Sequence, residues 1–184
     1  MANILIPIAD GTEEIEAVTL IDVLRRANLV VTVASVSDQL SIEGANGITI
    51  MADMLITDCY RDDVDMILLP GGWGGTDVFV ESEKLTSMLQ DMQTKGRLIG
   101  AMCAAPYALH KAGVLPSNYT CYPSVEEKIG TAGYISDQNI VEDGNVITSR
   151  GPGTAMCFAL AIVKKLAGEE KYNTLKSGLL ADFC

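Results

Sequence analysis

The stretch RLIGAMCAAPYAL, residues 97–109, decides the expected fold, because an apolar run gives way within it to a helix-like run. Residues 97–102 are typical of a buried strand, and residues 104–112 are typical of a helix. Pro106 is tolerated only in the first turn of a helix, because its ring fixes φ and its nitrogen carries no hydrogen. We therefore expect a helix that begins within a residue or two of Cys103, directly after a strand.

The same alternation of strand and helix extends in both directions from this stretch. Strands are expected at 3–9, 29–36, 48–53, 64–70 and 144–150, with a weaker candidate at 119–124, and helices at 13–27, 82–95, 151–168 and 169–180. Apolar strands separated by helices favour a parallel sheet that is covered on both faces. Functional residues gather at the carboxyl ends of such strands. No repeat or linker interrupts the pattern, so residues 1–184 are expected to form a single domain.

Composition and charge restrict the classes of function. Apolar residues make up 48% of the chain and charged residues 20%, which is typical of a globular protein. The net charge of −11, without a basic cluster, argues against nucleic acid and anionic membrane surfaces as partners. No apolar run approaches the ~20 residues of a membrane helix, and the opening MANILIPIAD indicates a strand rather than a signal peptide. The expected location is the cytoplasm.

The five cysteines follow no known metal or disulfide spacing. They are Cys59, Cys103, Cys121, Cys157 and Cys184, and the sequence contains no C-x-x-C motif. In a reducing compartment we expect free thiols, and we expect no metal site. All except Cys103 are interpreted as packing residues.

Two interpretations of Cys103 remain open from its position alone. Unpaired N–H groups and the positive end of a helix dipole would favour the thiolate, and the tight turn is similar to a hydrolase nucleophile elbow. Alternatively, the cysteine is a small buried hydrophobe. The only histidine, His110, lies seven residues farther along the same helix, about 10 Å away at ~1.5 Å per residue. A Cys–His dyad within the chain is therefore not expected, and His110 is assigned to the surface.

Glu16 lies on the apolar side of the helix expected at residues 13–27. At 100° per residue it falls between Val23 and Ala27, within the stripe that faces the core. Burial raises the pKa of a carboxyl, and a protonated glutamate beside a thiolate would donate to sulfur and carry protons. The alternative is a glutamate at the edge of the helix that reaches solvent, where the helix dipole also favours it.

Two glycine-containing turns follow expected strands. PGGWGG at 70–75 and SRGPGT at 149–154 lack the G-K-[ST] and G-x-G-x-x-G patterns of phosphate-binding loops. Their backbone N–H groups would suit an oxyanion pocket or an anion site. A plain connection between strand and helix is the alternative for both.

Four of these motifs together resemble a known family. DGTEEIEAV at 10–18, LPGGWGG at 69–75, AMCAAP at 101–106 and SRGPGTAMCFALAIV at 149–163 are similar to the ThiJ/PfpI superfamily. The resemblance is strongest to the branch of the parkinsonism-associated deglycase and its YajL-like bacterial relatives, and it covers essentially the whole chain. It implies a flavodoxin-like three-layer α/β sandwich with a mostly parallel central sheet, like class I glutamine amidotransferases. It also implies a homodimer without metal or organic cofactor.

The resemblance also assigns expected roles to residues. It implies that Cys103 is the nucleophile, that Glu16 is the buried glutamate bonded to it, and that the N–H groups of Gly72 and Ala104 form the oxyanion pocket. The possible pocket residues are Gly71, Tyr122, Arg150 and Pro152. Many relatives carry a histidine where Tyr122 stands here, and without that imidazole base peptidase activity is not expected.

The function implied by the resemblance is cysteine-dependent removal of reactive dicarbonyls. The expected substrates are small dicarbonyls such as methylglyoxal, or glycated protein side chains, in a glutathione-independent glyoxalase or deglycase reaction that protects against carbonyl and oxidative stress. The alternative is a redox-sensing thiol protein with chaperone (holdase) activity and little turnover. A nucleotide-binding flavodoxin-like module is a third interpretation, supported by the expected fold alone.

Overall fold

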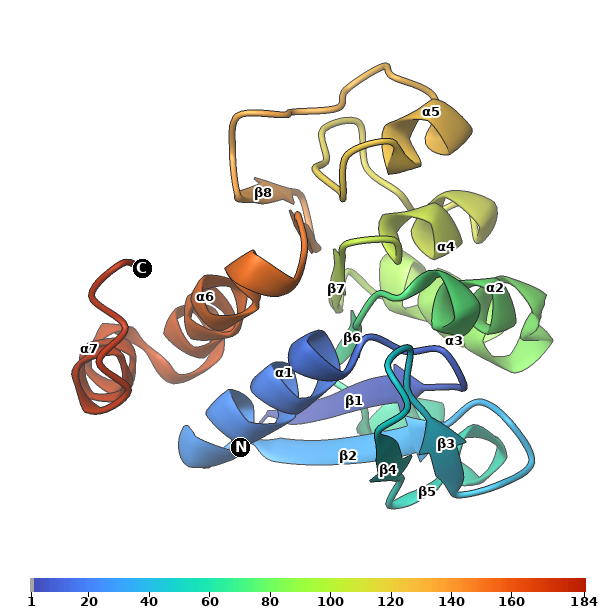
Figure 1. Ribbon diagram of the computed structural model, residues 1–184, viewed down its shortest axis with the longest axis horizontal. Helices are drawn as coiled ribbons and strands as arrows, with labels where there is room; N and C mark the ends of the chain where they lie inside the picture. Colours follow the sequence, from blue (N-terminus) through green and yellow to red (C-terminus); the bar gives the residue numbers. More distant parts are fainter. Residues whose placement is uncertain (1) are drawn as a thin grey trace.

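A seven-stranded sheet forms the centre of the molecule, with the strand order β5-β2-β1-β6-β7-β9-β8 (Figure 1). The computed structural model describes residues 2–184. Neighbouring strands run parallel, except that β8 pairs antiparallel with β9 at one edge. The strands are β1 (Asn3–Ile8), β2 (Val30–Ser35), β5 (Met54–Leu55), β6 (Met66–Leu69), β7 (Leu98–Met102), β8 (Ile140–Asp143) and β9 (Val146–Ser149).

Helices cover both faces of this sheet. The helices are α1 (Glu14–Arg26), α2 (Trp73–Glu81), α3 (Glu83–Thr94), α4 (Pro106–Lys111), α5 (Val125–Ile129), α6 (Ala155–Ala167) and α7 (Glu169–Gly178), with 3-10 turns η1 (Ile56–Asp58), η2 (Arg61–Asp63) and η3 (Pro152–Thr154). One face carries α1 and α6, with α7 packed against α6, and the other face carries α2, α3 and α4 (Figure 1). This arrangement confirms the predicted flavodoxin-like three-layer α/β sandwich with a mostly parallel central sheet.

Strand β1 shows why the sheet strands are apolar almost throughout. Ile4 and Ile6 pack against one helical layer, in the cluster that contains residues of α1 and α6. Leu5, between them, points to the opposite cluster, which contains residues of α3 and α4. All three side chains are at most 1% exposed. A strand buried on both faces has no polar side, so its sequence does not alternate.

One predicted strand belongs to a separate small sheet rather than to the central one. Residues 48–53 contain β4 (Thr49–Met51), which pairs with β3 (Ser41–Glu43) in a separate two-stranded sheet. The central sheet receives only the short β5 from this region. The side chains of β4 are exposed or half-buried, which fits a hairpin on the surface rather than a core strand.

Other segments also differ from the sequence predictions. Helix α2 begins at Trp73, within a glycine stretch that predicted only a turn, because the buried Phe79 anchors it despite the low helix propensity of glycine. Residues 119–124 form no strand beyond an isolated bridge between Tyr119 and Tyr134. Strand β8 was not predicted.

The prediction of five free thiols is wrong for two of them. Cys157 of α6 and Cys184 form a disulfide, whereas Cys59, Cys103 and Cys121 are free. Sequence reasoning missed the pair because the two cysteines are 27 residues apart and only the antiparallel return of α7 along α6 brings them together. Cys59 and Cys121 are buried, as predicted.

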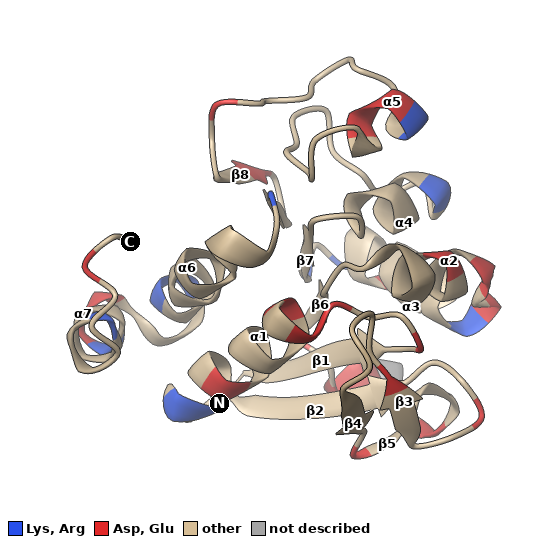
Figure 2. Ribbon diagram, in the orientation of Figure 1, with Lys and Arg blue, Asp and Glu red and all other residues tan. Residues whose placement is uncertain are grey.

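Charged side chains lie mainly at helix ends and in loops, and β1 and β2 carry none (Figure 2). The first turn of α1 is acidic and its last turn is basic, which matches the direction of the helix dipole. Within residues 2–184 no helix is long and apolar enough to cross a membrane.

Candidate active site

Cys103 lies directly after β7, in a turn at the carboxyl edge of the sheet. Its φ of +59° is in the left-handed region, which costs a non-glycine residue about 1–3 kcal/mol. Two backbone hydrogen bonds hold this turn: the Cys103 N–H donates to the carbonyl of Ser149 (3.0 Å), and the Cys103 carbonyl accepts from the N–H of Tyr122 (2.9 Å). The surrounding structure therefore fixes a strained cysteine in one orientation.

The helix after Cys103 begins later than the sequence predicts. Helix α4 starts at Pro106, with Ala105 as its N-cap, rather than at residue 104, so a short turn separates Cys103 from the helix. The N–H groups that act on the sulfur come from Gly72 and Ala104. One belongs to the turn after β6 and the other to the turn after β7.

Glu16 extends from the first turn of α1 into the interior, and its side chain is 0% exposed. Its Oε2 accepts a hydrogen bond of 2.6 Å from the N–H of Gly71. Its Oε1 is buried without a nitrogen or oxygen partner among the described residues. The Glu16 carboxyl and the Cys103 thiol are within hydrogen-bonding reach of each other. The prediction that Glu16 faces the interior rather than solvent is confirmed.

Gly71 is the point at which these groups converge. A Cβ placed on Gly71 would lie 2.6 Å from Cys103 Cβ, 2.8 Å from Glu16 Oε2 and 3.0 Å from Ala104 N. Only glycine leaves room for the thiol, the carboxyl and the amide to approach one another here. The strand register explains why these groups lie together. Leu69 of β6 pairs with Ala101 of β7, so the turn that follows β6 and the turn that follows β7 leave the sheet side by side.

Burial dominates the ionisation of this pair. It raises the pKa of Glu16 to about 7, against the opposing effect of the Gly71 N–H and the contact with Cys103. Burial also raises the pKa of Cys103, and the negative charge of an ionised Glu16 raises it further, while the N–H groups of Gly72 and Ala104 lower it. The backbone N–H groups therefore favour the thiolate, as expected, but burial opposes it more strongly.

The thiol and the carboxyl instead behave as one coupled unit. Two negative charges in contact in a buried site are strongly disfavoured, so the pair loses its first proton near pH 7 and resists losing the second. Glu16 is fully buried and has a free oxygen, whereas the sulfur is partly exposed and receives two N–H groups. When the pair holds a single proton, the N–H groups of Gly72 and Ala104 stabilise the charge on sulfur, and the N–H of Gly71 stabilises it on Glu16.

A cavity of about 200 Å³ lies near Cys103; Cys103 does not line it, but the N–H of its lining residue Tyr122 donates to the Cys103 carbonyl. Tyr122, Arg150 and Pro152 line it, together with Pro123, Asn139, Gly151, Gly153 and Thr154. The pairing of Met102 with Ser149 brings Arg150 to the same sheet edge as Cys103. The Nε of Arg150 is buried and has no hydrogen-bond partner within the described part of the chain. Arg150 therefore places a positive charge in the lining of the cavity.

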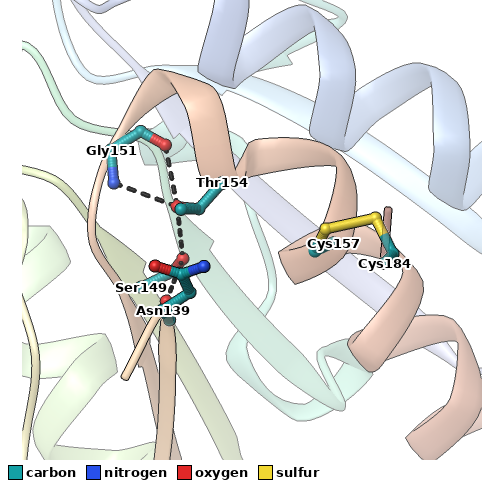
Figure 3. Close-up of a disulfide and its surroundings, with 6 residues drawn as sticks. All are labelled: Asn139, Ser149, Gly151, Thr154, Cys157 and Cys184. Carbon is teal, nitrogen blue, oxygen red and sulfur yellow. Dashed lines mark hydrogen bonds between the residues drawn. A yellow bond between two sulfur atoms is a disulfide. The ribbon is translucent and has the colours of Figure 1, made fainter. Parts of the chain in front are cut away.

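The turn on one side of this cavity is held by a hydroxyl network (Figure 3). The Thr154 hydroxyl contacts the Ser149 hydroxyl at 2.8 Å and bonds the backbone of Gly151. Ser149 also donates to the carbonyl of Asn139 (2.8 Å). Sequence reasoning missed Ser149, Thr154 and Asn139 as supports of the site, because serine and threonine after a strand carry no distinctive signal.

His110 is exposed and stacks on the Tyr107 ring, with ring centroids 6.4 Å apart. It lies on the surface, as predicted from its spacing to Cys103. Within residues 2–184, no group of three or more His, Cys, Asp or Glu side chains is arranged to hold a metal ion.

Gly71→Ala is expected to destabilise the protein by about 1–3 kcal/mol, because the new methyl group overlaps Cys103 and forces the turn to move. The free energy of unfolding from urea titration measures this loss. Gly178→Ala is the matched control, since no atom lies within 4 Å of a Cβ there, and it is expected to change stability by less than about 0.5 kcal/mol. Equal stabilities for both variants would contradict the described convergence.

The fold and site define a class: three-layer α/β proteins that hold a cysteine in a strained turn beside a buried glutamate. The model of the DJ-1/PfpI family matches residues 2–165, and the chain belongs to that family. The resemblance to the ThiJ/PfpI superfamily is thereby confirmed.

Relatives with assigned names support this membership. The chain is 40% identical to Protein dj-1beta of Drosophila melanogaster over 181 residues, which cover 97% of both proteins. The crystal structure of Drosophila DJ-1beta matches with a TM-score of 0.94 over 97% of each chain. The chain is 39% identical over 175 residues to Glutathione-independent glyoxalase DJR-1.2 of Caenorhabditis elegans, covering 95% of this chain and 92% of that protein. It is 42% identical to Protein DJ-1 homolog B of Arabidopsis thaliana, but spans only 41% of its length.

Proposed function

We propose that the protein converts small reactive dicarbonyls such as methylglyoxal to hydroxy acids without glutathione. The observation that carries the proposal is the convergence of the Cys103 thiol, the Glu16 carboxyl and two backbone N–H groups around Gly71. A nucleophile, a proton carrier and oxyanion donors are the groups that this reaction requires. The name of the Caenorhabditis relative assigns that protein such an activity.

In the first step the Cys103 thiolate attacks the aldehyde carbon and forms a carbon–sulfur bond. The N–H groups of Gly72 and Ala104 bind the resulting oxyanion, which takes the proton from Glu16 to give a hemithioacetal. These donors act on the sulfur in the free protein, so they lie beside the bond that forms. Charge moves from sulfur to oxygen within a site that is already arranged to hold it.

In the second step the Glu16 carboxylate removes the hydrogen of the former aldehyde carbon and returns it to the neighbouring carbon, while the hydroxyl proton passes from the first oxygen to the neighbouring carbonyl oxygen. The hemithioacetal thereby becomes a thioester of the hydroxy acid, with no external oxidant or reductant. Water, deprotonated by Glu16, then hydrolyses the thioester, releases lactate and restores the thiolate with a protonated Glu16. A carboxyl whose pKa is about 7 accepts and donates protons with similar ease at neutral pH.

The cavity lined by Tyr122, Arg150 and Pro152 is the proposed binding region for the rest of the substrate. The cavity opens to the surface at Tyr122, which is 48% exposed. A glycated side chain of another protein can therefore also enter it as substrate. We propose no peptidase activity, because Tyr122 supplies no imidazole base. The direct test is methylglyoxal consumption by the purified protein without glutathione, with lactate measured as the product.

We also propose a homodimer in the cytoplasm. Ile15 and Val18 of α1 are exposed, as are Ile48 and Met51 of the neighbouring hairpin. Hydrogen bonds from the backbone of Asn46 and Ile48 to Glu14 join that hairpin to α1. An apolar surface built across two joined elements is typical of an interface between copies of a chain.

Redox sensing with holdase activity is the second candidate, and the exposure of the free cysteines supports it. Cys103 is partly exposed, whereas Cys59 and Cys121 are buried. Peroxide therefore has access to one free sulfur in preference to the others.

Mild hydrogen peroxide is expected to add two oxygen atoms to Cys103 and to leave Cys59 and Cys121 unmodified. A protonated Glu16 would donate to the resulting sulfinate, which makes this oxidation state favourable. Intact mass and peptide mapping measure the result. Oxidation spread evenly over the three free cysteines would contradict the sensor proposal.

A further inference from the structure

The disulfide between Cys157 and Cys184 joins two elements of very different burial (Figure 3). Cys157 is the third residue of α6, a helix that contributes six buried residues to the core. Cys184 is the last residue of the sequence and follows α7, which contributes no buried residue. The covalent bond therefore ties a weakly packed segment to a strongly packed helix.

The segment from 169 to 184 packs against α6 but buries little apolar surface completely. Tyr172, Leu175 and Leu179 are only half-buried against the core, and Ala181 is the one fully buried side chain that follows α7. Leu180 and Phe183, on either side of it, are 81% and 73% exposed. A segment with so little buried apolar surface opens locally at a low free-energy cost unless a covalent bond prevents it.

Both sulfur-bearing residues are half-buried, so a small thiol can approach the bond from solvent. Neither residue belongs to the Cys103 site or lines its cavity. An inference about this disulfide therefore stands independently of the proposed dicarbonyl reaction.

We propose that Cys157 and Cys184 form a reversible thiol–disulfide latch that fixes α7 to α6 when oxidised and releases residues 169–184 when reduced. A dithiol reductant supplies the two electrons. Its first thiolate attacks the Cys184 sulfur and expels the Cys157 thiolate, and its second thiolate attacks the mixed disulfide and expels the Cys184 thiolate. The reductant leaves as a cyclic disulfide, and each cysteine takes up one proton.

Hydrogen exchange measured by mass spectrometry tests the latch on the whole protein, oxidised or reduced with dithiothreitol. Reduction is expected to add two hydrogens to the intact mass and to speed amide exchange in peptides from 169–184 roughly tenfold or more. Peptides from the buried strand β1 serve as the internal control and are expected to keep their exchange rates.

Variants separate this disulfide from the other cysteines. Cys184→Ser is expected to exchange like the reduced protein under both conditions, whereas Cys103→Ser is expected to keep the full response to dithiothreitol. Equal exchange of residues 169–184 in the oxidised and reduced wild-type protein would overturn the proposal. The reduced wild-type protein should lose two hydrogens again when it is treated with an oxidised dithiol. Failure to lose them would overturn the proposal as well.

Discussion

Cys103→Ser is expected to lower methylglyoxal turnover by at least about a thousandfold, the largest effect of any single change in the chain. A serine hydroxyl at the same position has a far higher pKa than a thiol, and the site holds no imidazole that would deprotonate it. The strained turn accepts serine as readily as cysteine, so the fold is expected to persist. The measurement is kcat and KM for lactate formation, with circular dichroism as a check on folding.

Cys59→Ser provides the matched control for this variant. Cys59 is a free cysteine, but it lies between β5 and β6, where its sulfur contacts Met54 rather than any residue of the site. Its turnover is expected to stay within about twofold of the wild type. A Cys103→Ser protein that consumes methylglyoxal at the wild-type rate would refute the assignment of Cys103 as the nucleophile.

Glu16→Gln is expected to lower kcat by about 10²–10⁴-fold and to leave KM nearly unchanged. The amide keeps the size of the glutamate and an oxygen that accepts from the Gly71 N–H, so the turn around Gly71 is preserved. It has no proton to give to the oxyanion and no basic oxygen to remove the hydrogen from carbon. A Glu16→Gln protein with wild-type kcat would show that another group moves the protons.

The same variant changes the dependence of stability on pH. In the unfolded chain a glutamate ionises near its ordinary pKa of 4.5, whereas burial raises the pKa of Glu16 in the folded protein to about 7. Between these values the folded state binds more protons, so the free energy of unfolding falls as the pH rises, by up to about 3 kcal/mol. Urea titrations from pH 4.5 to 7 are expected to show this fall in the wild type and its absence in Glu16→Gln.

The sheet and its helices were largely predictable because parallel strands buried on both faces leave long apolar runs in the sequence. The run 64–70 is the clearest example, and β6 lies within it. Glu16 was predictable for the converse reason, since a carboxyl on the apolar stripe of α1 is locally unfavourable. Each of these signals is contained within a single strand or helix.

Features that depend on contacts between distant segments were not predictable from local patterns. The strained φ of Cys103 depends on hydrogen bonds to Ser149, at the end of β9, and to Tyr122, in a distant loop. The pairing of Cys157 with Cys184 depends on how α7 returns along α6. The balance between burial and amide donors at the sulfur likewise depends on the three-dimensional surroundings, because the local pattern shows the donors but not the degree of burial.

The central claim is that Cys103 and Glu16 ionise as one unit, and the pH dependence of Cys103 alkylation by iodoacetamide tests it most directly. Peptide mapping follows Cys103 alone, in the wild type and in Glu16→Gln. The account predicts a wild-type rate that rises through an inflection near pH 7, where the pair loses its first proton, and the disappearance of that inflection from Glu16→Gln. Identical profiles for the two proteins, each with the midpoint of an ordinary thiol, would contradict it.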